Sequence, residues 1–344
     1  MLFLTMMKNL KIYTHSDIAP LESERVGAVT LSKRITFFSP ERDLAEQLQS
    51  TSAKYILFGI TEDAGIQANY GRPGARNAWK AALRVLVNVQ CNDFNQPEKM
   101  VLLGNLDFTK IINDLDLKPG FNRADLHETV SEIDKQVANL VEIIVAAGKI
   151  PIAIGGGHNN AYGMLKGTSK ALGKKVNAIN IDAHADLRPR DYRHSGNGFT
   201  YAYEEGFLRK YFIFGLHENY ITKAIAQNMA DWSDDIQYNT YEQLAVRREK
   251  DFDSQSQLAL DFVADDQSFF GLEIDLDVVE FMPSSALTPS GFSIENLRRL
   301  NHFFSRSDQL KYLHICEAAP NPENSDEMIK VGKSITYLIT DFVR

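Results

Sequence analysis

The sequence predicts an α/β fold in which a mostly parallel sheet is covered by helices on both faces. Two observations support this fold class. First, short apolar runs typical of buried strands alternate with longer segments whose apolar residues keep helical spacing. Second, polar residues that could carry chemistry follow several of the apolar runs directly, and ligands of parallel sheets bind beyond the carboxyl ends of the strands.

The first third of the chain supplies the first predicted elements. Residues 1–50 are poorly defined by their pattern, although a helix is expected to begin near Ser39. The runs 54–60 and 100–104 are short and apolar, and each ends at a polar loop or a glycine, which is typical of buried strands. A helix is expected between these two strands, over residues 75–88, after a loop that contains several glycines.

The middle of the chain contains the longest helical pattern. Asp125 can act as the N-cap of a helix that continues to Ala147, and Gly148 can end it. Its apolar residues keep a spacing of three or four: Leu126, Val130, Ile133, Val137, Leu140, Val141 and Ile144. Such a stripe is typical of a helix with one buried face.

The remaining elements continue the alternation of strands and helices. Further strands are expected at residues 150–154, 176–181, 211–214, 268–276 and 312–317. Further helices are expected at residues 161–172, 241–264 and 293–304, and residues 335–343 form either a strand or a helix. No linker rich in Pro, Gly or Ser and no internal repeat divides the chain, so one domain is expected over residues 1–344.

Composition restricts the class of partner and the location of the protein. The formal net charge is −8, from 37 basic and 45 acidic residues, and no block of Lys or Arg indicates a nucleic acid or a membrane surface as partner. No stretch reaches the roughly 20 apolar residues of a membrane span, and the apolar start Met1–Met7 is too short for a signal peptide. Cys91 and Cys316 are far apart and are expected to be reduced thiols. We therefore expect a cytoplasmic protein that acts on a small molecule.

The segment that follows the predicted strand 176–181 carries the strongest chemical signal. Asp182, His184 and Asp186 occupy alternate positions, and alternate side chains of an extended chain point to the same face. Two carboxylates and an imidazole that converge without basic partners would repel one another and would be costly to desolvate. A divalent cation removes this cost, so the pattern predicts half of a metal site.

Two other strand ends supply the second half of that site. Asp275 and Asp277 repeat the alternate spacing, and Glu273 lies on the same face one pleat deeper. His158 follows the glycines after strand 150–154. A set rich in carboxylates with some imidazole suits Mn²⁺ or Fe²⁺, whose ligand preferences overlap with those of Co²⁺. Six ligating side chains exceed what one ion takes when a water position stays open, so two ions are expected.

Each of these signals also has a plainer interpretation. A single aspartate at a strand end often caps a turn, and a histidine after a glycine loop is often structural; the joint occurrence favours metal. The remaining histidines are assigned to the surface or the core: His15, His127, His194, His217, His302 and His314. The segment 71–75 lacks the Gly-Lys-Ser/Thr of a phosphate-binding loop, and no Gly-x-Gly-x-x-Gly follows a strand, which argues against a dinucleotide site.

The ordered motifs resemble those of the ureohydrolase superfamily, which contains arginase, agmatinase and formimidoylglutamase. The resemblance extends from about residue 55 onward. Its motifs are Gly-Gly-x-His at 155–158, Asp-Ala-His-x-Asp at 182–186, Asp-x-Asp at 275–277, the glycine-arginine loop at 65–75, Ser-Gly-Asn at 195–197, Leu-Thr-Pro-Ser-Gly at 287–291 and Cys-Glu-Ala-Ala-Pro-Asn at 316–321.

The resemblance implies a three-layer arginase-like fold that holds two Mn²⁺ ions per chain. The first ion would bind to His158, Asp182, Asp186 and Asp275. The second would bind to Asp182, His184, Asp275 and Asp277, with Asp182 and Asp275 shared. The resemblance also implies a homo-oligomer, either a trimer or a hexamer.

The implied catalytic chemistry is attack of a metal-activated water on the planar carbon of an amidine or guanidine. Asp277 would accept and pass on the proton of the water, and Glu317 would anchor the cationic nitrogens. Ser195 and Asn197 would bind the amino-acid end of the substrate.

Several positions depart from the family pattern. Gly157 stands where the family usually has an Asp that orients the histidine, Glu273 stands where many members have a small residue, and Phe199 replaces the proton-shuttle histidine of arginases. Arg188 stands where arginases carry Asn, and it could bind a second substrate carboxylate, unless it pairs with a nearby acid. These differences argue against a standard arginase, and Arg188 favours N-formimidoyl-L-glutamate as the substrate.

Three alternatives remain open from the sequence alone. One is an agmatinase or another guanidino-acid ureohydrolase. A second is a non-catalytic family member whose metal site is degraded, which Gly157 and Phe199 would explain and which the presence of all six ligands opposes. A third, a two-metal phosphoesterase, lacks a basic cluster for phosphate.

Overall fold

The computed structural model describes residues 7–23, 26–116, 122–265 and 267–343; the apolar start lies almost entirely outside this part of the chain. The strands are β1 Leu10–Ile12, β2 Tyr55–Thr61, β3 Met100–Asp107, β4 Ile150–Ile154, β5 Val176–Ile181, β6 Leu208–Leu216, β7 Ile236–Thr240, β8 Phe270–Asp275 and β9 Leu310–Cys316. The helices are α1 His15–Ile18, α2 Leu44–Ser50, α3 Ala64–Ala68, α4 Ala78–Leu86, α5 Thr109–Asp116, α6 Arg123–Ala146, α7 Asn160–Leu172, α8 Gly198–Glu204, α9 Lys223–Asp231, α10 Phe252–Val263, α11 Ile294–Ser305 and α12 Ser325–Val343.

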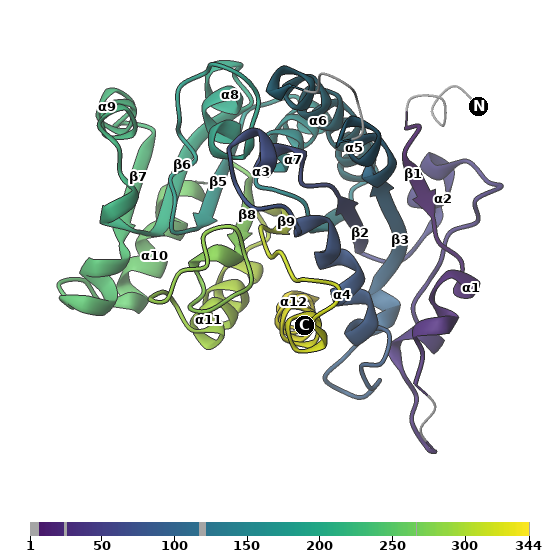
Figure 1. The fold of residues 1–344 in the computed structure, drawn as a ribbon. Helices are drawn as coiled ribbons and strands as arrows, with labels where there is room; N and C mark the ends of the chain where they lie inside the picture. The colour runs from purple at the N-terminus through teal and green to yellow at the C-terminus, as the bar shows by residue number, and fades with distance from the viewer. Residues whose placement is uncertain (1–6, 24–25, 117–121, 266, 344) are drawn as a thin grey trace.

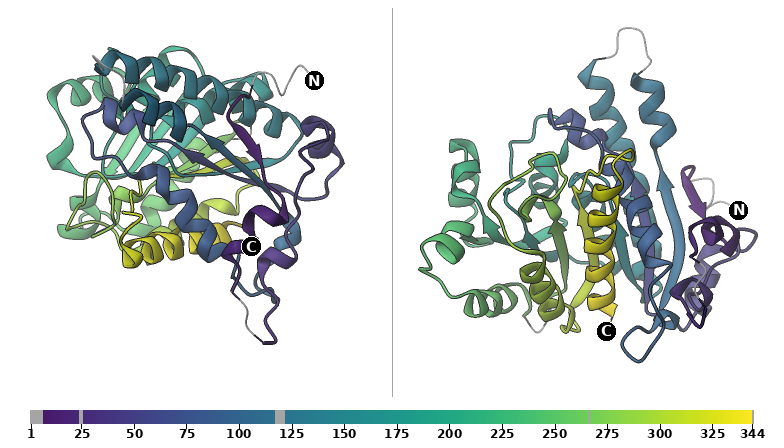
Figure 2. Two further views of the ribbon diagram at one scale, coloured as in Figure 1. Left: turned by 45° about the vertical axis from the view of Figure 1, so that its right-hand side comes forward. Right: turned by 60° about the horizontal axis from the view of Figure 1, so that its bottom comes forward.

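The strands form a single sheet whose order is β1-β3-β2-β4-β9-β8-β5-β6-β7. The short edge strand β1 is antiparallel to β3, and every other pair is parallel. Figure 1 shows α6, α7 and α8 on one face of the sheet and α4, α10, α11 and α12 on the other. The side-on view in Figure 2 shows the three layers directly. The predicted three-layer α/β fold with a mostly parallel sheet is thus confirmed.

Two hydrophobic cores lie between these layers, one on each face of the sheet. Alternate residues of a strand enter opposite cores: Leu57 of β2 packs on the α4 and α12 side, whereas Ile56 and Phe58 pack on the α6 and α7 side. Because both faces are covered, the central strands are largely apolar, and β2 and β5 are buried at every residue.

Several predicted boundaries near the N-terminus are corrected by the structure. The early helix α2 begins at Leu44 rather than near Ser39, because the side chain of Asp43 caps it by accepting a hydrogen bond from the Glu46 amide. The helix predicted over 75–88 is α4, which a short 3-10 turn shortens at its N-terminal end.

Other boundaries are corrected farther along the chain. Asn122, not Asp125, is the N-cap of α6, and Asp125 completes a capping box with it. The predicted helical region 241–264 is divided between a π-helical turn, Glu242–Val246, and α10. Residues 335–343 form the end of α12. Short elements were missed: β1, β7, α3, α5, α8 and α9.

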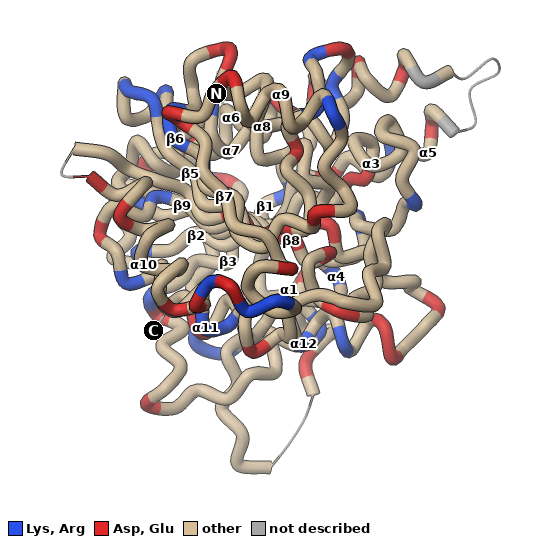
Figure 3. Tube along the Cα trace, turned by 90° about the vertical axis from the view of Figure 1, so that its left-hand side faces the viewer, with Lys and Arg blue, Asp and Glu red and all other residues tan. Residues whose placement is uncertain are grey.

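The surface of the described chain has no simple charge division on the face that Figure 3 shows. Acidic and basic residues are interspersed along the trace in that view, as the composition predicts for a protein without a basic block. Among the described residues, no helix combines the length and the apolar character needed to cross a membrane.

Candidate metal centre and substrate cavity

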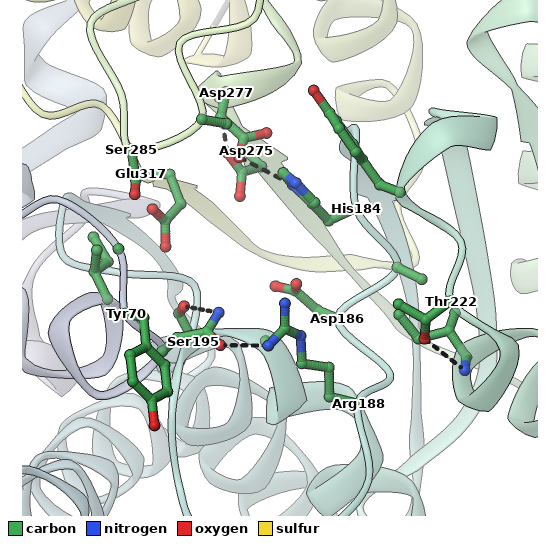
Figure 4. A pocket seen from close by; sticks show the side chains of 18 residues that line it. Tyr70, His184, Asp186, Arg188, Ser195, Thr222, Asp275, Asp277, Ser285 and Glu317 are labelled. Carbon is green, nitrogen blue, oxygen red and sulfur yellow. Dashed lines mark hydrogen bonds and ion pairs between the residues drawn. The ribbon is translucent and has the colours of Figure 1, made fainter. Parts of the chain in front are cut away.

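The candidate site lies at the carboxyl ends of four strands that are neighbours in the sheet, β4, β9, β8 and β5. His158 follows β4, Asp182 follows β5, Asp275 ends β8 and Glu317 follows β9. Parallel strands bring their carboxyl ends to one edge, which explains why residues far apart in sequence meet here. Figure 4 shows Asp186, Asp275, Asp277, His184 and Glu317 around a common space.

A first cluster of possible ligands is centred on His158. Its Nδ1 atom lies 3.1 Å from Asp182 Oδ2, 3.0 Å from Asp186 Oδ2 and 3.1 Å from Asp275 Oδ2. Ligand atoms of these four residues lie within 4.8 Å of one another. The composition of this cluster agrees with the first ion site that the sequence predicts.

A second cluster shares Asp182 with the first and lies nearer to solvent. His184 Nδ1 is 3.1 Å from Asp277 Oδ2 and 3.5 Å from Asp182 Oδ1. Asp275 Oδ1 does not join this cluster in the structure, because it accepts a hydrogen bond of 2.8 Å from the Asp277 amide. The cluster therefore consists of Asp182, His184 and Asp277.

The electrostatics of these clusters fit divalent cations. Burial, together with the carboxylates of Asp277 and Asp182, raises the pKa of Asp275 well above its ordinary value. Both ring nitrogens of His158 and Oδ1 of Asp277 are buried without a hydrogen-bond partner. Buried donors and acceptors are almost always satisfied, so the orphaned atoms and the crowded carboxylates indicate a site built for cations.

Two residues of the site have a backbone conformation that L-residues seldom adopt. Asp186 has φ of 49° and Glu317 has φ of 64°, both in the left-handed region. Strain of this kind persists where the surrounding structure fixes it, and it is concentrated at functional sites. The Glu317 carboxylate is fixed in turn by the His158 amide, which donates to its Oε1 at 2.8 Å. Burial and the neighbouring Asp277 raise the pKa of Glu317 to about 8.

A cavity of about 190 Å³ opens over both clusters. Figure 4 shows Asp275, Asp277, His184 and Glu317 on one side of this cavity and Arg188 and Ser195 on the other, with Asp186 beside Arg188; Asn69 also lines the cavity. The size suits a small organic molecule, with the metal ligands at one end and a cation at the other.

Arg188 and Ser195 are brought together by a residue that the sequence did not single out as a site residue, Asn69. The Arg188 guanidinium donates to Asn69 Oδ1 at 2.9 Å, and Asn69 Nδ2 donates to Ser195 Oγ at 3.1 Å. Among the described residues, no acidic side chain forms an ion pair with Arg188, so the pairing considered as an alternative is absent. The only sequence signal for Asn69 is its place in the glycine-arginine loop.

Asn197 does not line the cavity, which corrects its predicted direct contact with substrate. It is fully buried, and its Oδ1 accepts a hydrogen bond of 2.5 Å from Arg193. Arg193 in turn is held by the Asp134 carboxylate of α6 at 2.7 Å. Asn197 thus anchors the loop that carries Ser195.

Phe199 is also fully buried and lies outside the cavity. Its ring meets the ring of His158 edge-on, with 5.3 Å between centroids, and stacks on Tyr211. The residue in place of the arginase proton-shuttle histidine therefore packs behind His158, a predicted metal ligand.

Comparison with known proteins identifies a family model, curated relatives and solved structures that resemble this chain. The model of the arginase family matches residues 53–340. The formimidoylglutamase of Macrococcus caseolyticus is 26% identical over 286 residues, which cover 82% of each chain. That of Staphylococcus epidermidis is 28% identical over 170 residues, and the match spans only about half of its length, 49% of each chain. A crystal structure of Trypanosoma cruzi formiminoglutamase with Mn²⁺ superposes with a TM-score of 0.69 at 20% identity, covering 92% of this chain and 99% of that one.

Proposed function

Because the chain belongs to the arginase family, we propose that it is a hydrolase that cleaves N-formimidoyl-L-glutamate to L-glutamate and formamide with two Mn²⁺ ions. One observation carries the proposal. One cavity has two clusters of carboxylate and imidazole side chains at its base and, at its side, the guanidinium of Arg188, which has no acidic partner among the residues that the structure describes. The names of the relatives, formimidoylglutamase in the curated matches, support this choice of substrate.

The ligands would divide between the ions as their clusters suggest. The first cluster, His158, Asp182, Asp186 and Asp275, would hold one ion, and the second cluster, Asp182, His184 and Asp277, would hold the other. Asp275 would be the further ligand of the second ion that the family resemblance implies, once its side chain gave up the hydrogen bond from the Asp277 amide. Carboxylate-rich ligand sets with imidazole suit Mn²⁺. When bound, a pair of such cations would supply an activated water near neutral pH and would stabilise the negative charge on the oxygen that attacks the formimidoyl carbon.

The protein's own side chains would position the substrate and move its protons. Glu317 would accept hydrogen bonds from the cationic nitrogens of the formimidoyl group. Arg188 would bind a carboxylate of the glutamate part, and Ser195 would donate to the same end. Asp277 Oδ1, which has no partner in the structure, would accept the proton of the attacking water and deliver it to the leaving amine nitrogen.

The test is an assay of the purified protein, loaded with Mn²⁺, against formimidoylglutamate, arginine, agmatine and guanidinobutyrate. Release of formamide from formimidoylglutamate, without urea from the guanidines, is the expected result. Urea release without formamide would instead support the guanidino-acid alternative. No product from any substrate, together with fewer than one bound ion per chain, would indicate the non-catalytic alternative.

Replacement of Arg188 tests the carboxylate contact specifically. R188M should raise KM for formimidoylglutamate about 10- to 100-fold and change kcat less, because a charge-assisted hydrogen bond to a non-reacting group is lost. The matched control is R190M. Arg190 is exposed, bonds to Glu205 and does not line the cavity, so its loss should leave KM unchanged. Equal KM values for the two variants would remove Arg188 from the substrate site.

A further inference from the structure

A row of polar side chains crosses the sheet directly beneath the metal ligands. The parallel pairing places Asn180 of β5 opposite Glu273 of β8, and Glu273 opposite His314 of β9. Asp182 and Asp275 each lie two residues farther along these strands. Because alternate residues of a strand share a face, the row faces the same side as the ligands and lies one pleat deeper.

The contacts within the row join it to His158. His314 Nδ1 lies 2.6 Å from Glu273 Oε2, and the same oxygen lies 3.6 Å from His158 Nε2. Glu273 and His314 are fully buried, and His158 is 1% exposed. Among the described residues, neither Lys nor Arg pairs with Glu273, so the two histidines are its only ionic partners.

These contacts leave the two nitrogens of His158 with different surroundings. Nδ1 faces the three carboxylates of the first cluster at 3.0–3.1 Å, whereas Nε2 faces Glu273. A histidine binds a metal through one nitrogen, and its other N–H is generally directed to a carboxylate or carbonyl that fixes the ring and the tautomer. Glu273 is the carboxylate on the Nε2 side of the ring, and its Oε2 lies 3.6 Å from Nε2, slightly beyond the length of a direct hydrogen bond.

We infer that Glu273, itself held by His314, is the positioning residue that orients His158 toward the first ion. This inference rests on the proposed function, since it presupposes the two-ion centre. It gives a reason for two departures from the family pattern. Gly157 lacks the carboxylate that orients the histidine in the family. Glu273 supplies a carboxylate from β8, one pleat beneath the site.

The loop that carries Gly157 has no room for the usual arrangement. The Gly157 amide donates to Glu62 Oε1 at 2.8 Å, and a Cβ atom at this position would lie 2.6 Å from Asn159 Oδ1 and 3.3 Å from Glu317 Oε1. A side chain at 157 would therefore press on Asn159 and Ile66 and would bring a further carboxylate close to Glu317, so we assign the orienting role to Glu273 of β8.

The experiment measures Mn²⁺ binding rather than activity. Wild type, E273Q and E273L are titrated with Mn²⁺ by calorimetry, and spin coupling between the two ions is followed by electron paramagnetic resonance. In E273L the affinity for one ion should fall about 10- to 100-fold, with loss of the coupled signal and retention of the other ion. E273Q, which keeps an oxygen acceptor of the same size on the Nε2 side of His158, should lose much less.

The matched control is D341N. Asp341 of α12 is also a buried carboxylate, but its partner is Arg298 of α11, and neither residue belongs to the two clusters. Its replacement should therefore leave both ions in place. Thermal unfolding of all variants shows whether each one is folded. If E273L binds both ions with wild-type affinity, Glu273 does not position His158, while the proposed function stands. If the wild type itself fails to bind two ions, both the inference and the proposed function are wrong.

Discussion

Gly157 shows how one residue of this site depends on its neighbours. Its amide binds the buried Glu62 carboxylate, which also accepts a hydrogen bond of 2.6 Å from Asn160. Glu62 therefore holds the main chain that presents His158. The sequence marks Gly157 as a departure from the family but does not reveal Glu62, because its partners lie about 95 residues away in the chain.

Restoring the family's aspartate should therefore destabilise this protein. G157A adds a Cβ atom that would lie 2.9 Å from Ile66 Cγ1, and overpacking of this kind costs about 1–3 kcal/mol of unfolding free energy. G157D should cost more than G157A, because it also adds a carboxylate beside Glu62 and Glu317. Urea unfolding of both variants measures the difference. A G157D variant as stable as the wild type would contradict this account of the loop.

His194 gives a second prediction at the residue scale. Burial, with the nearby Arg188 and Arg193 guanidinium groups, lowers its pKa to about 4. Unfolded histidine has a pKa of about 6.5, so the unfolded state takes up the proton first. Stability should therefore fall as pH decreases from about 6.5 to about 4, and this group should cause no further loss below that range.

The comparison of H194N with the wild type isolates this effect. The Asn oxygen can replace Nδ1 as the acceptor of the Gly196 amide. The wild type should lose about 2 kcal/mol across the pH window, while H194N loses correspondingly less in urea unfolding. H302N, at an exposed histidine of α11, is the control and should keep the wild-type profile. Identical pH profiles for wild type and H194N would disprove the assignment.

At the scale of elements, the packing of α7 on α6 fixes the end of the loop that carries His158. α7 begins at Asn160, two residues after His158, and it packs closely on α6 through Gly163 and Gly167. A Cβ atom at Gly167 would lie 2.4 Å from the Ala138 carbonyl oxygen. Close approach of the two backbones thus requires glycine on this face of α7.

G167A should destabilise the protein although alanine favours helix formation. The intrinsic gain is about 1 kcal/mol, whereas separation of packed helices is expected to cost about 1–3 kcal/mol more than that gain. Unfolding free energy from urea titration is the measurement. K170A, at an exposed position of the same helix, should stay within about 0.5 kcal/mol of the wild type. Stabilisation by G167A would show that the helices are not in close contact.

The sequence predicts those parts of the site that depend on local spacing. Asp182, His184 and Asp186 occupy alternate positions directly after β5, and this spacing was enough to predict that they share one site, although Asp186 reaches it with a left-handed φ of 49° rather than an extended backbone. Asn197 was misassigned because its partner, Arg193, is oriented by Asp134 of α6, a contact that no local pattern encodes. In the same way, short elements such as α3 and β7 depend on tertiary contacts rather than on periodicity.

At the scale of the molecule, the clusters join strands from both halves of the sheet, so bound ions should stabilise the whole fold. Removal of metal by a chelator should lower the unfolding free energy by about 3 kcal/mol for each ion, if the free metal concentration before chelation is a hundred times the Kd of that ion. Differential scanning calorimetry before and after chelation measures this change. D182A, which lacks the shared ligand, should respond much less. An unchanged wild-type midpoint would mean that the ions do not contribute to folding stability.

The position of β9 has a consequence for the order of assembly. β9 is the last strand of the chain, yet it lies between β4 and β8 in the sheet. Before it inserts, the strands form two separate groups, and His158 belongs to one group while Asp182, His184 and Asp277 belong to the other. During synthesis, the cluster of Asp182, His184 and Asp277 can therefore form on a nascent chain. The cluster around His158 would form only after β9 has joined the two groups, so the two ions of the proposed centre would be acquired one after the other.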